Sequence, residues 1–275
     1  MTLAVAVVTL AYMRGWLRLR SSAQTIGGWR AAGFLLGLVL IWIAVASPLA
    51  SGDAHSLTVH MVQHLVLMSI APPLIWLADP VRTLSCALPA RLTESVVLRV
   101  ARWRPIERLG RLLGHPVVCW LAATIALVAW HVPALLTRSI QSNAWHATEH
   151  ASFLAGGLLF WWPVVQPWST SSTEPPWSIV LYLFLATLPC DALSGFLVFS
   201  ERIAYPIYSS AHRHATLSAL DDQQLAGALM WTVVTIVYVV AGVIVATRSL
   251  SRSSVLVDGP SALDVVCDLR SGLVP

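Results

Sequence analysis

The sequence predicts an all-α polytopic membrane protein, a bundle of seven transmembrane helices, and three observations predict it. Charged residues make up only 11% of the chain and the mean hydropathy is +0.72, whereas a soluble domain has about 25% charged residues. Seven apolar stretches each approach the roughly 20 residues that cross the hydrocarbon of a bilayer. All 17 lysine-plus-arginine residues are arginines, and they lie in loops between these stretches.

The seven predicted spans follow one another along the chain. In the first, the arginines follow the apolar run instead of preceding it, so we expect a retained anchor rather than a cleaved signal peptide. Pro48 and Pro133 close the second and fourth spans, because proline cannot continue the helical hydrogen-bond pattern. The spans are expected at about residues 2–17, 29–47, 57–78, 115–132, 143–165, 177–199 and 223–247.

Two segments are expected outside the hydrocarbon core. Residues 79–114 interleave arginines with apolar residues, a pattern typical of amphipathic helices that lie in the membrane interface. The residues after Arg248 are polar and mixed. We therefore expect one transmembrane domain over 1–248 and a flexible cytoplasmic tail over 249–275.

The loop arginines predict the orientation of the bundle. Fourteen lie in the loops after the first and third spans and in the C-terminal tail, and three lie on the opposite side. The positive-inside rule places the larger set in the cytoplasm, with the N-terminus outside and the C-terminus inside. Because topology accounts for the basic charge, the expected partner of these arginines is the lipid bilayer and no nucleic acid.

Histidines gather at the outer side of this bundle. His60 and His64 lie one turn apart on one face of the third span, where an ionisable residue is costly and by default marks a functional site. His146 and His150 repeat that spacing at the outer end of the fifth span, and His131 ends the fourth span there. Imidazole suits copper, zinc and haem iron. These five histidines are therefore candidate metal ligands.

Four further residues are expected to support this site. Glu149, Asp191 and Asp222 would accept hydrogen bonds from the ligand imidazoles and so orient them. Met68 lies one turn beyond His64, and its thioether would favour cuprous ion. Three more outer histidines would form an entry path for a metal: His55, His212 and His214.

Several other functions stay open from the residues alone. Residues 146–150, HATEH, match the H-x-x-E-H pattern of inverted zincins. A separate alternative is a membrane zinc hydrolase acting on lipid amides, in which histidines and an aspartate surround zinc and Asp191 or Glu149 is the base. The histidines would otherwise form a polar network in a purely structural scaffold. A copper transporter is disfavoured, because only His115 lies on the cytoplasmic side. The absence of lysine excludes a retinal protein with a Schiff-base lysine.

Several stretches, read together, carry a family resemblance. They are HMVQHLVLMSIAPPLIWL at 60–77, WHVPALL at 130–136, HATEHASFLAGGLLFWWPV at 146–164, FSERIAYPIY at 199–208 and DDQQLAGALMW at 221–231. With these stretches the chain resembles the CtaG family of bacterial (caa-type) cytochrome c oxidase assembly proteins, the seven-helix membrane type. The matching polar residues are His60, His64, His131, His146, His150, Asp222 and Gln223.

The resemblance implies a multi-pass protein of the bacterial cell membrane that is needed to form active haem-copper oxidase. It implies a role in delivering or inserting copper, and no reaction catalysed by the protein itself. Copper is then the expected metal, with haem or zinc as alternatives. The implied partners are oxidase subunits and a copper chaperone. Copper enters the oxidase on the outer face of the membrane, which is the side where the histidines are expected.

Overall fold

The structure, a computed structural model, describes residues 2–20, 27–47, 52, 55–87, 104–165, 176–209 and 217–257. Within these ranges the chain is helical and contains no strand. The helices are α1 (Thr2–Arg20), α2 (Gly28–Ala46), α3 (Leu57–Leu65), the π-helix η2 (Val66–Ile70), α4 (Ala71–Leu77), α5 (Pro80–Ala87), α8 (Arg104–Leu113), α9 (Pro116–Trp130), α10 (Pro133–Gln141), α11 (Asn143–Val165), α12 (Pro176–Phe199), the 3-10 helix η4 (Pro206–Ser209) and α13 (Ala219–Val257).

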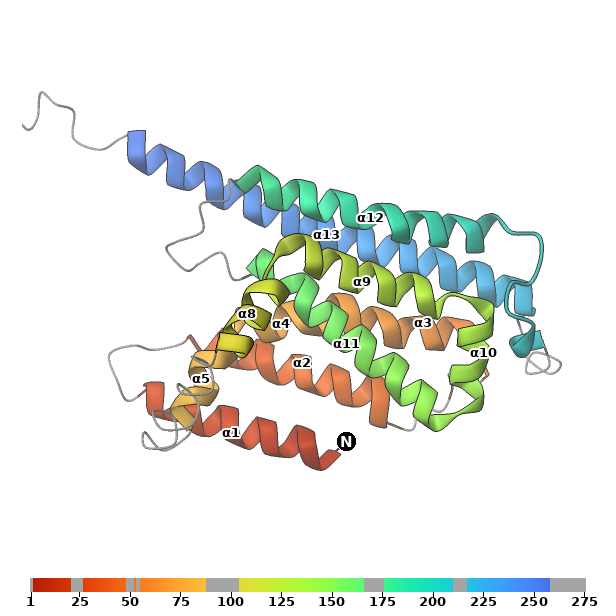
Figure 1. The fold of residues 1–275 in the computed structure, drawn as a ribbon, viewed down its shortest axis with the longest axis horizontal. Helices are drawn as coiled ribbons and strands as arrows, with labels where there is room; N and C mark the ends of the chain where they lie inside the picture. Colours follow the sequence, from red (N-terminus) through yellow and green to blue (C-terminus); the bar gives the residue numbers. More distant parts are fainter. Residues whose placement is uncertain are drawn as a thin grey trace, which may run out of the picture.

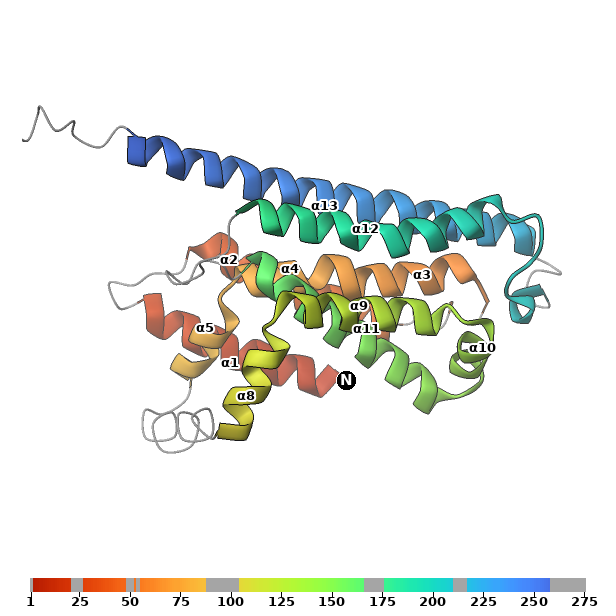
Figure 2. The same cartoon turned by 45° about the horizontal axis from the view of Figure 1, so that its top comes forward.

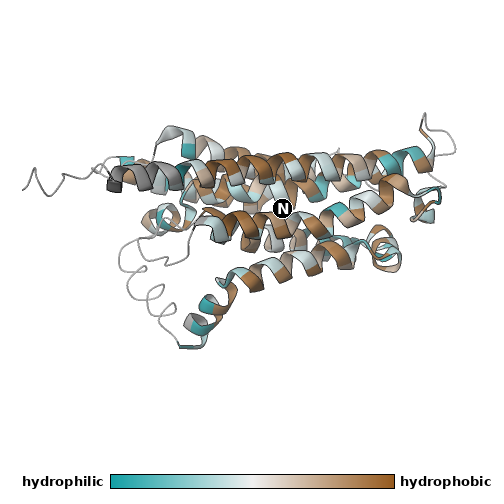
Figure 3. Ribbon diagram, turned by 90° about the horizontal axis from the view of Figure 1, so that it is seen from above, coloured by the Kyte–Doolittle hydropathy of each residue, from teal (hydrophilic) through white to brown (hydrophobic). Residues whose placement is uncertain are grey.

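The long helices run side by side along the long axis of the molecule (Figures 1 and 2). α10 crosses one end of this bundle, whereas α5 and α8 lie at the other end. Apolar residues occupy the middle of the long helices, and hydrophilic residues gather toward their ends (Figure 3). This distribution is the one expected of helices that cross a membrane.

Five helical segments are long and apolar enough to span a bilayer: Thr2–Arg20, Gly28–Ala46, Leu57–Leu77, Trp177–Phe199 and Ala219–Ser249. α9 and α10 together make a sixth candidate, bent by 77° at the break before Pro133. α11 is not among them although it has 23 residues, because its first turns carry His146, Glu149 and His150. The described chain is thus a multi-pass helical membrane protein, and seven spans stay a prediction.

The predicted boundaries differ from the structure mainly at the bundle ends. α10 was not expected; it begins at Pro133, which favours the first turn of a helix. α13 continues to Val257, so the segment predicted as a tail begins inside a helix, and its residues 258–275 lie outside the described residues. In the predicted interfacial segment the structure describes α5 and α8, and residues 88–103 lie outside the described residues.

Prolines disturb the third span just beyond its histidines. Pro72 and Pro73 lack the backbone N–H that would continue the helical pattern, and the chain forms the π-helix η2 before them, where the Ala71 N–H bonds to the carbonyl five residues earlier, that of Val66. The Met68 carbonyl, left free by Pro72, accepts a hydrogen bond from the Trp161 indole at 3.1 Å. π-helical turns are rare and occur often at functional sites.

α11 crosses η2 with no room for a side chain at Gly157. A Cβ atom there would lie 2.7 Å from the Met68 carbonyl oxygen and 2.9 Å from the Leu67 carbonyl oxygen. Glycine therefore lets the two backbones approach closely, as in other small-residue contacts of membrane helices. Two turns toward its N-terminus, the same helix carries Glu149 and His150.

Candidate metal centre

The N-terminus of α3 is capped by two side chains, those of Ser56 and of Asp222 on α13. The Ser56 hydroxyl accepts a hydrogen bond from the Val59 N–H at 3.4 Å. The buried Asp222 carboxylate on α13 accepts hydrogen bonds from Ser56 Oγ at 2.9 Å, Leu57 N at 2.7 Å and Thr58 N at 3.3 Å. A carboxylate at a helix N-terminus satisfies free N–H groups and the helix dipole. Asp222 thus holds the start of the helix that carries His60.

We expect Asp222→Ala to destabilise the protein, because it removes the acceptor of the Leu57 and Thr58 N–H groups. Loss of a helix cap costs about 0.5–2 kcal/mol of unfolding free energy, which thermal unfolding of the purified protein in detergent would detect. The matched control is Glu201→Ala, which removes an exposed acid near the end of α12. Equal unfolding midpoints for the two variants would contradict the capping role.

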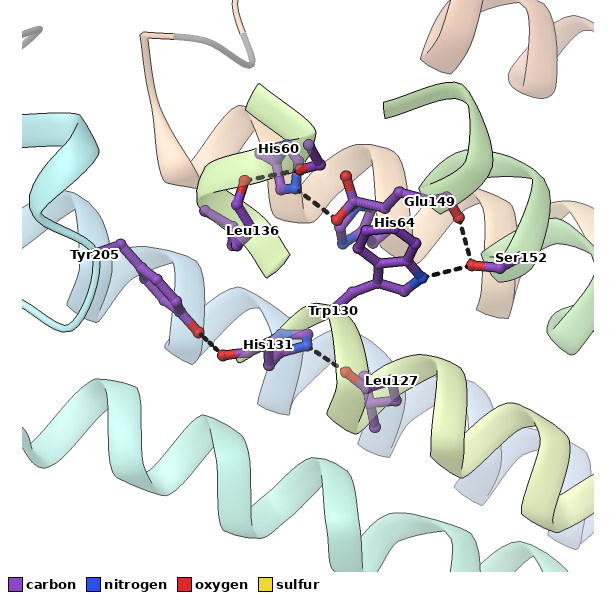
Figure 4. A network of polar contacts seen from close by, with 10 residues as sticks. His60, His64, Leu127, Trp130, His131, Leu136, Glu149, Ser152 and Tyr205 are labelled. Carbon is purple, nitrogen blue, oxygen red and sulfur yellow. Dashed lines mark hydrogen bonds and ion pairs between the residues drawn. The ribbon is translucent and has the colours of Figure 1, made fainter. Parts of the chain in front are cut away.

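His60 and His64 meet a carboxylate from α11. Both imidazoles are buried, and Glu149 between them is fully buried. Glu149 Oε1 lies 3.3 Å from His60 Nε2 and 3.4 Å from His64 Nε2 (Figure 4). One ligand atom from each of these three residues lies within 4.8 Å of the other two. The sequence prediction gave Glu149 a supporting role beside the candidate ligands, and the structure brings its carboxylate into direct contact with His60 and His64.

His146 and His150 extend the cluster along α11. The His60 and His146 rings are stacked with their centroids 5.7 Å apart, and the His64 and His150 centroids are 6.1 Å apart. The two α11 rings are 4.1 Å from each other. The two helices thus bring together the four histidines that share the i, i+4 spacing. His146 is half-buried, whereas His150 is buried.

The cluster is short of hydrogen-bond partners. Among the described residues, no hydrogen-bond partner is present for five buried atoms: His60 Nδ1, His64 Nδ1 and Nε2, His150 Nε2 and Glu149 Oε2. Buried polar atoms are normally paired, and each unpaired one costs about 1–3 kcal/mol. Such a deficit in a set of imidazoles and a carboxylate suits a site that receives a metal ion with its bound water.

His131 is not one of the three residues whose candidate ligand atoms lie within 4.8 Å of one another. Its Nδ1 is 2.7 Å from the Leu127 carbonyl oxygen, so Nδ1 carries the proton and Nε2 keeps its lone pair. The Tyr205 hydroxyl donates to the His131 carbonyl at 3.0 Å, and burial raises the pKa of Tyr205, which keeps this donor protonated. His131 and His64 both line a partly open cavity of about 30 Å³.

The remaining predicted residues take different places. Asp191 is half-buried on α12, and its carboxylate makes no hydrogen bond or ion pair with a described residue. Met68 is buried in η2 and lines the same cavity as His131. His55 is exposed just before α3. The other two histidines of the predicted entry path, His212 and His214, lie outside the described residues.

The sequence motifs did not predict the structural roles of two buried side chains, those of Gln223 and Trp161. Gln223 is buried on α13, where its Oε1 accepts from Ala204 N at 2.7 Å and its Nε2 donates to Arg202 O at 3.2 Å. It holds the loop that carries Tyr205. Trp161 bonds to the carbonyl beside Pro72. In both cases the sequence feature that could have predicted the role was a side chain with a hydrogen-bonding group inside an apolar span.

Comparison with known proteins now identifies the family. A family model described as "Cytochrome c oxidase caa3 assembly factor (Caa3_CtaG)" matches residues 10–252. The chain belongs to the Caa3_CtaG family. The match runs from α1 into α13 and so includes every residue of the histidine cluster, in agreement with the resemblance carried by the sequence motifs.

Two curated relatives of this Caa3_CtaG chain carry no function in their names. They are "Uncharacterized protein Mb0105" of Mycobacterium bovis and "Uncharacterized protein MT0111" of Mycobacterium tuberculosis. Each is 23% identical over 235 residues, which cover 83% of this chain and 35% of the relative. The chain thus spans about a third of the length of the curated relatives it matches. No solved structure matches it.

Proposed function

We propose that this protein is a membrane assembly factor for haem-copper cytochrome c oxidase, and that it binds copper at His60, His64 and Glu149 and helps insert it. Family membership supports the oxidase pathway. One observation carries the metal site: a fully buried carboxylate oxygen lies within 3.4 Å of two imidazole nitrogens on a neighbouring helix. In this proposal copper is cargo to be handed over, and the protein catalyses no reaction of its own.

The donor set and the available space both favour a single ion. Two imidazoles and a carboxylate suit divalent copper, zinc or iron. His150 and His146 lie next to these ligands and would take part in accepting or releasing the ion. The Phe153 ring stacks on His64 with centroids 4.0 Å apart, and the adjoining cavity of about 30 Å³ holds one or two waters.

We further propose seven spans with the N-terminus outside and the C-terminus in the cytoplasm of a bacterial cell. α1 and α13 both run from right to left in Figure 1, and an odd number of spans requires this shared direction. The arginine-bearing helix α8 lies at the end opposite α10, which suits the positive-inside rule. The histidine cluster would then face the outer side, where oxidase subunits or a copper chaperone would meet it.

A membrane zinc hydrolase is the second candidate, because the glutamate of the HATEH motif faces a histidine pair. A hydrolase needs a carboxylate free to deprotonate a metal-bound water. Glu149 Oε1 instead contacts both His60 and His64, which suits a ligand better than a base. Zinc retained in Glu149→Gln, together with loss of a lipid-amide hydrolase activity, would favour the hydrolase.

The test of the proposed function is oxidase maturation in cells. In a strain lacking this protein, we expect oxidase with sub-stoichiometric copper, and the wild-type chain should restore both copper content and oxygen consumption. Glu149→Gln should restore neither, because an amide is a poor metal ligand compared with a carboxylate. The matched control His55→Ala removes an exposed histidine outside the cluster and should complement the strain.

Full complementation by Glu149→Gln, in cells where the variant is present at the wild-type level, would contradict the copper role. That result would mean that the protein acts in oxidase assembly without binding metal at Glu149, and it would favour a role as a structural scaffold.

A further inference from the structure

A second cluster of candidate metal donors surrounds a partly open cavity beside the histidine cluster. The cavity of about 30 Å³ lies between α3, η2, α9, α11, α12 and α13. Its lining includes four sulfur-bearing side chains, those of Met61, Met68, Met230 and Cys190. All four are at least nine-tenths buried. A cavity of this size has room for a single ion or about two waters.

The concentration of sulfur at this place is unusual for the chain. Only five methionines occur in the sequence, and three of them line the cavity; the other two are Met1 and Met13. Of the three cysteines in the part of the chain that the structure describes, Cys190 lines it as well. Methionine often fills gaps in a core, but here three methionines surround a gap that stays open.

His131 lines this cavity, and one of its ring nitrogens has no hydrogen-bond partner among the described residues. Its Nδ1 is engaged by the Leu127 carbonyl at 2.7 Å, which leaves Nε2 as the acceptor. That atom is buried and has no hydrogen-bond partner in the described part of the chain. A buried unpaired acceptor costs about 1–3 kcal/mol, and an ion in the cavity would remove that cost.

We propose that the cavity is a second metal site, which takes a soft monovalent ion, Cu(I), on the sulfur atoms of its lining together with His131. Thioether and thiolate donors select Cu(I), whereas the His60–His64–Glu149 group, with its carboxylate, suits a divalent ion. His64 belongs to that group and also lines the cavity. The two sites are thus adjacent.

The choice of copper rests on the proposed function, but the site is tested on its own residues. The probes are Cu(I) under anaerobic reducing conditions and Ag(I), its redox-inert analogue, added to the purified full-length protein in detergent. We expect metal-edge X-ray absorption of the wild-type protein to show sulfur scattering. The triple variant Met61→Leu/Met68→Leu/Met230→Leu should bind Ag(I) at least about tenfold more weakly, and its remaining sulfur scattering should fall to that of Cys190 alone. It should keep Cu(II) at the histidine cluster.

Two controls separate the outcomes. Met13→Leu, a methionine on α1 away from the cavity, should bind Ag(I) as the wild type does, and Glu149→Gln should keep Ag(I) while it loses Cu(II). Leucine is close to methionine in volume, and far-ultraviolet circular dichroism checks the fold. If the triple variant does not fold, Cys190→Ser and Met230→Leu are measured singly, with a lower Ag(I) affinity expected for each.

Wild-type protein that binds Cu(II) without any sulfur scattering from Cu(I) or Ag(I) would overturn the cavity site alone. Undiminished Ag(I) binding in the folded cavity variants would overturn it too. Loss of Cu(II) binding in the wild type, with Ag(I) still held on sulfur, would instead reject the proposed histidine site and leave the cavity site standing.

Discussion

The double variant His60→Ala/His64→Ala is expected to lose Cu(II) binding by at least about 100-fold. Both imidazoles are buried beside Glu149, within 3.4 Å of its Oε1, so their removal takes away two of three ligands. Loss of an outer-shell partner alone costs about 10- to 100-fold in metal affinity. Isothermal titration of the purified protein with a competing chelator measures the change, and bound copper is counted by elemental analysis.

The matched control is His115→Ala. His115 is exposed at the start of α9, where its Nδ1 accepts from Val117 N at 3.3 Å, and its removal should leave copper affinity within about twofold. Because the double variant leaves the buried Glu149 carboxylate without its two partners, which destabilises a protein, far-ultraviolet circular dichroism checks its fold, and His60→Ala and His64→Ala are measured singly if it does not fold. Wild-type copper affinity in the folded double variant would refute the histidine site.

Gly157→Ala is expected to destabilise the protein and to weaken metal binding at a site two helical turns away. The new Cβ would lie 2.7 Å from the Met68 carbonyl oxygen and 2.8 Å from Met68 Cα. Both are backbone atoms, so α11 itself must move away from η2. Overpacking of this kind costs about 1–3 kcal/mol of unfolding free energy. The same shift would draw Glu149 away from the histidines of α3.

Gly156→Ala is the control next in sequence. A Cβ there would lie 3.5 Å from Ala123 Cα, which is an ordinary contact, so stability and copper affinity should stay near those of the wild type. Thermal unfolding and Cu(II) titration are measured on both variants. If the two alanine variants behave alike, the close approach of α11 and η2 does not position the site.

The order of helices followed from hydropathy, which is a local property. The span predicted at 29–47 corresponds to α2, and the one at 177–199 corresponds to α12. The extension of α13 to Val257 was missed, because the polar sequence after Arg248 ends the apolar run without ending the helix. Hydropathy reports where lipid contact ends, whereas the hydrogen bonds of a helix continue as long as the backbone allows.

Within the site, the residues of one helix face were easier to predict than contacts between helices. The pairs His60 with His64 and His146 with His150 share faces because residues four apart do so in any α-helix. The direct contact of Glu149 with both α3 imidazoles was not predicted, since it depends on how α11 is rotated against α3. His131 was grouped with these histidines by its position at a span end, whereas in the structure its Nδ1 bonds to the Leu127 carbonyl and the residue lines the cavity.

The sequence by itself determined a family, a helical membrane protein and a set of histidines at one side of it, because hydropathy, charge placement and helical period act over neighbouring residues. Only the tertiary structure decided that Glu149 joins His60 and His64, that Asp222 caps α3, and that sulfur gathers around one cavity. These contacts join residues far apart in the chain. They depend on the angle and depth at which helices cross, and here Gly157 and the π-helix before Pro72 set both.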